Sequence, residues 1–560
     1  MEKSNQRYLN YFLLACVFTI NVLAGFLFFR WDLTSEKRHS LTDDTKTLIE
    51  ELNDVVFVSV YLEGELPAEF ARLKNGVKEK LDEMRAYTTN IQYEFINPSE
   101  SELASERNAV YQQLVDDGLT PTTIPIREKD GVSEKIIFPG AILRIGDKTV
   151  PLQLLKSQEM IPSQAMINKS ITNLEYFIST SIKRATRAKD PAIGFTRGHG
   201  ESMPLKLEDI AGELDDQYVV KYVPLTEKLN SLFGYDVIVI SNPTIPFTEK
   251  EKFVLDQYIM RGGKAVFLVQ SMDVHLDSLK GNTQKVALAQ NLNLDDLFFK
   301  YGVRVNRDVI LDQNCGPIVV NVGTYGNKPK LEPFPWFYHP VMVPQGAHPI
   351  LINVDPVLTQ FPASLDTIGI KDIKKTILLG SSPYNKRLRS PVRVSINTVG
   401  LPPDFTDTKS DLKPMAALLE GRFNSLFTNR IPEKIVNDTN IRYLEKGLAS
   451  KILVIADGNF IENPVDTLKK TYFPLGFDTQ VAKRPIFGNK EFFLNAINYL
   501  VGDNELISVR SREIKVRKLD ADKLVNQKSR YQSINLIFPL VFLVLLGIVN
   551  FLIRKRKYGQ

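Results

Sequence analysis

The sequence predicts a membrane-anchored α/β protein in which two α/β units lie between one transmembrane helix at each end of the chain. Three observations lead to this fold class. Apolar runs without a charged residue lie near both termini. Between them, short apolar segments of strand length alternate with segments whose apolar residues have helical spacing. The chain has 560 residues, of which 43% are hydrophobic and 24% are charged, so it is long enough for several globular domains.

The distribution of charge argues against a nucleic-acid partner. The net charge is +5, and residues 1–7 and 554–557 account for this excess, so the rest of the chain carries no basic surplus. A nucleic-acid-binding domain is expected to carry its surplus on its folded surface.

The two cysteines, Cys16 and Cys315, are too few for a disulfide framework and form no CxxC motif for zinc. We therefore expect neither a bound metal nor another cofactor.

The two apolar runs are predicted to be transmembrane helices. They cover residues 11–29 and 534–553, and at about 1.5 Å per residue each spans a hydrocarbon layer of about 30 Å. Apolar sequence continues well beyond Cys16, which argues against signal cleavage there and predicts an uncleaved anchor. Basic residues near the spans are equally numerous on both sides, but residues 554–557 (RKRK) form a dense block. This block favours cytoplasmic tails and a large middle segment outside the cytoplasm.

The first α/β unit is predicted over residues 30–189. Thr42 is the expected N-cap of its first helix, and a strand follows at residues 55–62. A helix from Pro67 then leads to a strand at residues 91–96, and this β-α-β order implies a parallel pair. The remaining predicted elements are a hairpin at residues 139–150 and a helix at residues 160–188 that ends in the basic cluster Lys183, Arg184, Arg187 and Lys189.

The second α/β unit is predicted over residues 190–503. Its best-defined helix begins at a capping box formed by Thr248 and Glu251. Its last helix is expected to be capped by Asn489 and to end at Gly502. The predicted strands cover residues 192–196, 218–223, 235–240, 264–269 and 451–456.

Two further segments are assigned from their composition. Residues 318–350 are rich in Pro and Gly and are predicted to form long loops or insertions. Basic and apolar residues alternate from Arg510 to Lys518, which is typical of an edge strand or stem leading to the membrane, or of a surface that contacts anionic lipid or an acidic partner. The predicted organisation is a cytoplasmic tail (1–10), a transmembrane helix (11–29), an N-terminal α/β domain (30–189), a second α/β domain with insertions (190–503), a juxtamembrane stem (504–533), a transmembrane helix (534–553) and a cytoplasmic tail (554–560).

Polar residues follow three of the predicted strands of the second unit. Ligands of a doubly wound sheet bind beyond the carboxyl ends of its strands, so these residues are candidates for binding a ligand or a partner. His199 and Glu201 belong to a Gly-His-Gly-Glu sequence after the first strand, and Asn242 follows the third. Asp457 and Asn459 follow the last strand. The simpler alternative is that all three segments are tight turns and that His199 faces solvent.

No catalytic motif accompanies these loops. The run closest to a phosphate-binding loop, residues 261–265 (RGGKA), lacks the upstream Gly and the Ser or Thr that holds magnesium. The sequence contains no GxSxG elbow. Cys315 lies next to Gly316 and Pro317, so we expect an unreactive thiol in a loop. These observations predict that the protein is not an enzyme and does not hydrolyse ATP itself.

Six segments in order along the chain carry a resemblance to a known family. They are residues 30–41 (RWDLTSEKRHSL), 61–70 (YLEGELPAEF), 198–201 (GHGE), 416–430 (AALLEGRFNSLFTNR), 454–461 (VIADGNFI) and 487–503 (FGNKEFFLNAINYLVGD). Together they resemble the auxiliary, so-called substrate-binding subunit of the gliding-motility ABC transporter of gliding bacteria, its G component. The resemblance runs from one end of the chain to the other.

The resemblance implies a two-pass protein of the bacterial inner membrane whose large domain lies in the periplasm. It implies a non-catalytic accessory subunit that works in gliding motility with a membrane permease and a cytoplasmic ATPase and binds a partner or cargo. It also implies that the second unit is related to class I glutamine amidotransferases and to a domain of an intraflagellar-transport subunit. Amidotransferases need a nucleophilic Cys after a central strand, whereas this chain has Gln270-Ser271-Met272 there, so we expect a degenerate amidotransferase-like sheet. The alternative is a membrane-anchored solute-binding receptor or hydrolase with its site at the loops after the strands.

Overall fold

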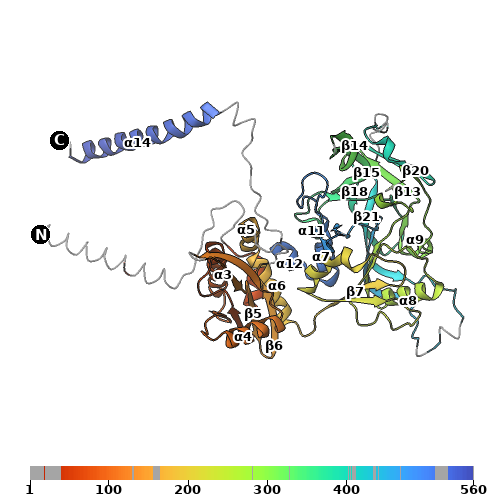
Figure 1. Cartoon of the computed structure of the whole chain (residues 1–560), viewed down its shortest axis with the longest axis horizontal. Coiled ribbons are helices and arrows are strands. Elements are labelled where there is room, and N and C mark those ends of the chain that lie inside the picture. The colour runs from red at the N-terminus through yellow and green to blue at the C-terminus, as the bar shows by residue number, and fades with distance from the viewer. Residues whose placement is uncertain are drawn as a thin grey trace. The chain divides into compact units, whose positions relative to one another are not determined.

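The computed structural model divides into two compact units, Met1–Arg512 and Glu513–Gln560 (Figure 1). The residues that the structure describes are 18, 40–128, 131–155, 164–279, 282–326, 328–401, 403, 405, 411–432, 437–438, 441–466, 468–510 and 528–558. The predicted tail at residues 1–10 and the first predicted span at residues 11–29, apart from Phe18, lie outside the described residues.

The C-terminal unit contains one long helix, α14 (Lys528–Tyr558). Its segment Ser529–Arg556 is long and apolar enough to cross a membrane and includes the span predicted at residues 534–553. None of its most apolar window is buried by the rest of the chain. The second predicted span is therefore a candidate transmembrane helix, identified by its length and composition.

The N-terminal part of the first unit is a four-stranded sheet with the order β2-β1-β5-β6, coloured red to orange in Figure 1. As predicted, β1 and β2 are parallel and are connected through α3, and β5 and β6 form an antiparallel hairpin. Thr42 caps α2 through its side chain, which accepts a hydrogen bond from the Thr45 N–H. The elements are α2 (Asp43–Glu50), β1 (Val56–Val60), α3 (Ala68–Arg85), β2 (Ile91–Phe95), α4 (Ala104–Asp116), β3 (Thr122–Glu128), β4 (Gly131–Ile137), β5 (Gly140–Ile145) and β6 (Lys148–Gln153).

The helix predicted at residues 160–188 is two helices, α5 (Gln164–Thr172) and α6 (Leu174–Thr186). The break lies at Asn173, whose backbone (φ −94°, ψ 6°) leaves the helical region. Asn has a low helix propensity because its side chain competes for backbone hydrogen bonds. The apolar faces of α3 and α6 pack together in one hydrophobic core with the sheet.

The second part of the first unit contains five parallel strands in the order β8-β7-β9-β10-β22. Numbered along the chain, this is the order 2-1-3-4-5 of one common doubly wound fold, in which the direction of winding reverses between the first and third strands. The strands are β7 (Ala192–Arg197), β8 (Val219–Pro224), β9 (Val237–Ser241), β10 (Lys264–Leu268) and β22 (Lys446–Ile455).

Helices cover both faces of these parallel strands. α7 (Pro204–Asp215) and α11 (Asn489–Val501) contact each other on one face, and α8 (Glu249–Met260) packs on β21 and β22 from the other (Figure 1). The capping box predicted at the start of α8 is present. The N-cap of α11 is Gly488 and not Asn489, because the Asn489 side chain bonds instead to the Leu358 and Phe460 carbonyls.

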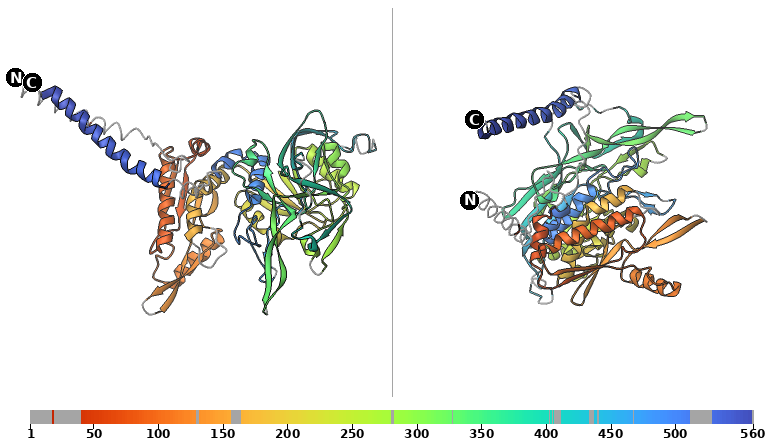
Figure 2. Two further views of the ribbon diagram at one scale, coloured as in Figure 1. Left: turned by 90° about the horizontal axis from the view of Figure 1, so that it is seen from above. Right: turned by 90° about the vertical axis from the view of Figure 1, so that its left-hand side faces the viewer.

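An antiparallel half extends this sheet beyond β22 in the order β21-β18-β15-β14. Of the two alternatives predicted for residues 318–350, long loops are wrong, because β14 (Cys315–Tyr325) and β15 (Lys328–Pro344) form a long hairpin that projects in Figure 2. This hairpin is an insertion in the chain between the parallel strands β10 and β22. Pro329, Pro333 and Pro335 are separated by even numbers of residues along β15, so the edge at which they lack an N–H group is the same for all three.

Cys315 is likewise the first residue of a strand and not a loop residue, and burial raises the pKa of its thiol to about 11.

The remaining described elements complete the second half of the chain. They are η1 (Leu276–Leu279), β11 (Gln284–Ala287), α9 (Asp295–Tyr301), β12 (Val303–Val305), β13 (Asp308–Asp312), η2 (Pro349–Leu351), β16 (Val357–Leu358), β17 (Leu365–Thr367), β18 (Ile373–Gly380), β19 (Asn385–Arg389), β20 (Val392–Ser395), η3 (Ile396–Thr398), β21 (Pro414–Asn424), β23 (Val465–Asp466), β24 (Thr471–Tyr472) and α12 (Asn504–Arg510).

The predicted stem at residues 504–533 does not begin at residue 504. Residues 504–510 form α12, whose Leu506 and Val509 are buried against Tyr176 of α6. α12 also contacts α2 and α11, so it belongs to the folded unit. The amphipathic pattern explains this outcome, since apolar residues spaced three apart need a surface to cover them.

Candidate functional site

The five predicted site residues lie at the carboxyl edge of the parallel strands, on both sides of the point where the winding reverses. His199 and Glu201 follow β7, and Asn242 follows β9. β22, which precedes Asp457 and Asn459, is separated from β7 by β9 and β10. The loops nevertheless meet, because the Asn242 amide donates a hydrogen bond to Asn459 Oδ1 at 3.1 Å. We call these five residues, together with Ser202 and Glu462, the loop cluster.

His199 is buried, so the expectation that it faces solvent is wrong. Its ring stacks on Phe247 with centroids 3.9 Å apart and an interplanar angle of 6°. Its Nε2 lies 3.2 Å from Glu251 Oε2, and its Nδ1 lies 3.8 Å from Glu201 Oε1. Burial alone would lower the pKa of His199, but the two carboxylates outweigh burial and raise it. The two carboxylates approach opposite ring nitrogens, so the three residues do not converge on one metal position.

Glu201 holds the turn after β7 together. Its Oε2 accepts a hydrogen bond from the His199 N–H at 2.7 Å, and its Oε1 accepts one from the Thr196 hydroxyl at 3.0 Å. Burial acts to raise the pKa of Glu201, but these hydrogen bonds and His199 lower it overall. Gly200 has a positive φ of 70°, and a Cβ there would lie 2.1 Å from Thr244 Oγ1. The turn therefore requires Gly at this position.

Ser202 and Glu462 join the loops after β7, β9 and β22, although the sequence analysis did not identify them. The Ser202 hydroxyl donates to Glu462 Oε1 at 2.6 Å, and Lys206 Nζ lies 2.8 Å from Glu462 Oε2. The Asn242 amide also reaches Glu462 Oε1 at 3.4 Å. Their signal in the sequence is position alone, since each lies within seven residues of the end of a strand.

Asp457 is completely buried and serves the backbone. Its two carboxylate oxygens accept hydrogen bonds from the Gln360 N–H at 2.8 Å and from the Asn459 N–H at 2.9 Å. Burial raises the pKa of Asp457 to about 7. The adjoining Gly458 has no room for a side chain, because a Cβ would lie 2.2 Å from Asn242 Oδ1.

The position after β10, where an amidotransferase needs its nucleophile, also has a structural use. The Gln270 side chain accepts a hydrogen bond from the Gly458 N–H at 3.2 Å and donates one to the Phe361 carbonyl at 2.9 Å. The Ser271 hydroxyl donates to the Asn306 carbonyl at 2.6 Å. Most polar groups of the loop cluster are thus engaged by the chain's own hydrogen bonds and ion pairs, as in a structural polar network. Within the described residues, His199 Nδ1 and Asn242 Oδ1 are buried without a hydrogen-bond partner.

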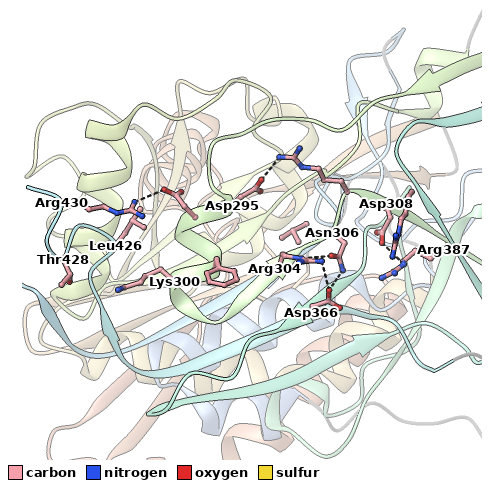
Figure 3. Close-up of a pocket in the computed structure, with 15 residues that line it drawn as sticks. Asp295, Lys300, Arg304, Asn306, Asp308, Asp366, Arg387, Leu426, Thr428 and Arg430 are labelled. Atoms are coloured by element: carbon pink, nitrogen blue, oxygen red, sulfur yellow. Dashed lines mark hydrogen bonds and ion pairs between the residues drawn. The ribbon is translucent and has the colours of Figure 1, made fainter.

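A large open pocket lies elsewhere, between α9, the start of β13, the end of β19 and the loop after β21. Its volume is about 1050 Å³, and charged side chains dominate its lining (Figure 3). We call it the charged pocket. The sequence carries no local signal of this pocket, because its residues are scattered over 136 positions of the chain and only the tertiary fold brings them together. Its lining residues are Asp295, Asp296, Phe299, Lys300, Arg304, Val305, Asn306, Arg307, Asp308, Asp366, Arg387, Arg389, Leu426, Thr428 and Arg430.

A third polar cluster joins the N-terminal sheet domain to the doubly wound domain. Asp503, at the end of α11, pairs with Arg187 and, at 3.2 Å, with Lys183, which belong to the predicted basic cluster. The Tyr218 hydroxyl donates to the same carboxylate at 2.8 Å. Burial acts to raise the pKa of Asp503, but the two cations lower it overall. Beside it, Ser508 of α12 donates a hydrogen bond to Asp44 of α2. We call this cluster the domain junction.

Comparisons with known proteins place most of the chain in described families. A family model described as an ABC-type uncharacterized transport system matches residues 190–496, and a domain of unknown function matches residues 35–144. An uncharacterized protein from Borreliella burgdorferi is 22% identical over 564 residues, which covers 97% of both chains. The first match spans more than half of this chain.

Two solved structures are more distant. The N-terminal domain of IFT52 has a TM-score of 0.30 and 14% identity, and the match covers 55% of this chain and 96% of that one. A ThuA-like protein from Parabacteroides merdae has a TM-score of 0.27 and 12% identity, with 56% and 90% covered. TM-scores this low do not assign a fold.

Proposed function

The chain belongs to the family described as an ABC-type uncharacterized transport system, and we propose that it is a non-catalytic, membrane-anchored accessory subunit of such a transporter. The observation that carries the proposal is the family match over residues 190–496 in a chain that also contains a candidate transmembrane helix. The proposed partners are a membrane permease and a cytoplasmic ATPase, as the resemblance to the gliding-motility transporter implies. A separate ATPase agrees with the lack of a phosphate-binding loop in this sequence.

The proposed location is the bacterial inner membrane, with both ends of the chain in the cytoplasm and the large domain in the periplasm. The basic block at residues 554–557, which directly follows the apolar part of α14, supports cytoplasmic tails. The motifs that resemble the gliding-motility transporter support a role in gliding. Protease added to intact spheroplasts should digest the large domain and leave the C-terminal tail, and the opposite result would invert this orientation.

The closed loop cluster supports a non-catalytic role. Its carboxylates already accept hydrogen bonds from the chain, and the Ser202 and Ser241 hydroxyls lie 3.1 Å apart, with Ser202 committed to Glu462. A hydrolase at these loops would need a free nucleophile and an open approach to it. The same arrangement weighs against a solute-binding site at the ends of these strands.

The domain junction supplies a route by which the membrane part can affect the folded head. α2 is the first described element after residues 1–39, and α12 is the last one before residues 511–527. These two helices contact each other and α6, next to the Asp503 cluster. Along the chain, the first described elements reached from either predicted span are therefore helices at the interface between the two α/β domains.

Purification of the tagged full chain from its native membranes in mild detergent tests the proposal. An ABC permease and an ABC ATPase should elute with it and be identified by mass spectrometry. A monomeric chain free of both, under conditions in which another ABC transporter of the same membranes stays assembled, would refute the accessory role.

Substitution of Asp503 tests the domain junction. Asp503→Asn should lower the free energy of unfolding by about 3 kcal/mol, because Arg187 and Lys183 lose a partly buried partner. Glu505→Gln is the matched control, since Glu505 also pairs with Lys183 but its side chain is 52% exposed, and it should change stability little.

Because the folded pKa of Asp503 is lowered, its contribution to stability is present at neutral pH and is lost as the pH falls below about 4. Thermal unfolding of both variants and the parent chain at pH 7 and at pH 2.5 measures the effect.

A further inference from the structure

We propose that the charged pocket binds a small anionic organic ligand that carries a phosphate or carboxylate group. This inference concerns a different part of the molecule from the loop cluster and does not depend on the accessory role. It rests on the balance of charges that line the pocket, on two cations without a carboxylate partner, and on the size of the space between them.

Positive charge exceeds negative charge in the lining of the pocket. Six Lys or Arg side chains line it, against four Asp side chains. The Asp residues are spread over the lining and are each engaged by a cation of the chain. The ion pairs are Arg304–Asp366 at 3.6 Å, Arg307–Asp295 at 2.9 Å, Arg387–Asp308 at 3.3 Å and Arg430–Asp296 at 3.5 Å. Figure 3 marks ion pairs between the lining side chains with dashed lines.

Two of the carboxylates have little capacity left for a further cation. Asp308 accepts hydrogen bonds from the N–H and the hydroxyl of Ser364, at 2.9 and 2.7 Å, in addition to its contact with Arg387. Asp296 is shared between Arg430 and the buried Lys252, whose Nζ lies 3.0 Å away. The acidic residues of the pocket are therefore neutralised from within the chain.

Lys300 of α9 and Arg389 of β19 are the cations left over. Within the part of the chain that the structure describes, neither makes an ion pair with a carboxylate. Arg389 lies directly opposite Asp308 in the β13–β19 ladder, yet Asp308 is taken up by Ser364 and Arg387. A guanidinium with its donors free binds phosphate or carboxylate in a two-pronged geometry, and an ammonium adds a point charge.

The volume and one apolar side chain narrow the ligand further. A space of about 1050 Å³ suits a small molecule and not a folded chain. Phe299, which precedes Lys300 on α9, lines the pocket and is 56% exposed. An exposed aromatic face beside cations suits a ligand that has both a charged group and an apolar ring face, such as a phosphorylated or carboxylated sugar.

Isothermal titration of the full chain in detergent with glucose 6-phosphate, glucuronate and glucose tests the proposal. At least one charged sugar should bind, and neutral glucose should bind at least tenfold more weakly, because a charge-assisted hydrogen bond contributes about a tenfold change in affinity or more. Binding of glucose 6-phosphate alone would identify a phosphate ligand, and binding of glucuronate alone a carboxylate ligand. Failure of both charged sugars to bind would overturn the proposal.

Two variants and a matched control locate the binding. Arg389→Ala and Lys300→Ala should each weaken binding of the charged sugar about tenfold or more, with unchanged thermal unfolding because both side chains lie at the surface of the pocket. Lys386→Ala is the control, since Lys386 lies on the same strand as Arg389 but does not line the pocket. Equal weakening in Lys386→Ala, or no weakening in either pocket variant, would show non-specific attraction and contradict the assignment.

Discussion

The loop cluster and the charged pocket differ in how they use their charges. In the loop cluster, His199 lies between two carboxylates, and Asp457 is fully buried and bonded to the backbone. In the charged pocket, the acidic residues are likewise paired, but Lys300 and Arg389 remain and a space of about 1050 Å³ stays open. The comparison teaches that a position where the winding of a doubly wound sheet reverses is not sufficient for a ligand site. Charged side chains without a partner in the chain and an open space are also required.

Burial explains why the two regions should respond differently to substitution. When a substitution removes the hydrogen-bond partner of a buried polar group in the loop cluster, no water replaces that partner. An exposed group in the pocket forms a hydrogen bond with water instead. The loop cluster should therefore govern stability, and the pocket should govern binding. Three substitutions, taken in order of expected effect, test this division.

Asp457→Ala should produce the largest effect, a loss of about 4 kcal/mol in the free energy of unfolding. The substitution leaves two backbone N–H groups, those of Gln360 and Asn459, without acceptors in the interior. Asp295→Ala, in the pocket, is the matched control and should cost about 0.5 kcal/mol or less, because that carboxylate is 66% exposed. Denaturant titration at pH 5, below the raised folded pKa of Asp457, measures both, and similar losses in the two variants would contradict the contrast between the regions.

The pH dependence of Asp457 offers a second measurement on the same residue. Its folded pKa is raised to about 7 from an ordinary value of 3.8, so the folded state holds the proton over this interval while the unfolded state releases it. Its contribution is therefore greatest below pH 4 and is lost as the pH rises to about 7. In Asp457→Asn this component of the pH dependence should disappear, and a variant that keeps it would show that the group titrates normally.

Much of this architecture could be predicted from the sequence, because local signals agree with the final packing. The capping box of Thr248 and Glu251 and the buried runs at β9 and β10 gave helix and strand positions close to those observed. The doubly wound arrangement also follows from the order of elements. The failure at residues 318–350 has a physical cause, since Pro and Gly counts hid the fact that three Pro residues share one edge of β15.

The candidate site was only partly predictable. The sequence placed Asn242 and Asn459 after strands, and the structure shows that their side chains are hydrogen-bonded. The sequence did not indicate that the His199 ring would be buried and stacked on Phe247. Enclosure depends on residues such as Glu251, which is remote in sequence and carries no local signal of this contact. The charged pocket has the same difficulty on a larger scale. Among the described residues, Lys300 and Arg389 lack a carboxylate partner because the nearby carboxylates pair with other cations across the tertiary fold.

His199→Asn should have an intermediate effect that depends on pH. Glu201 and Glu251 face the ring and raise its folded pKa, so His199 contributes most below about pH 6.5 and less as the pH rises through the folded value. The substitution should cost about 2 kcal/mol at pH 6 and clearly less at pH 9, where the stacking on Phe247 and one hydrogen bond of the neutral imidazole are lost. Thermal unfolding of both proteins at the two pH values measures this difference, and a cost independent of pH would mean that the imidazole stays neutral between the two carboxylates.

Arg304→Ala should have the smallest effect on stability and completes the comparison. Arg304 and Asp366 lie opposite each other in the β12–β17 pair, 3.6 Å apart, with side chains that are 61% and 53% exposed. Water replaces the lost partner at such a site, so we expect a change of about 0.5 kcal/mol or less in the free energy of unfolding. Denaturant titration at low and high salt measures it. A loss comparable to that of His199→Asn would mean that the ion pairs of the pocket hold the fold together, as those of the loop cluster do, and the division between a stabilising and a binding region would fail.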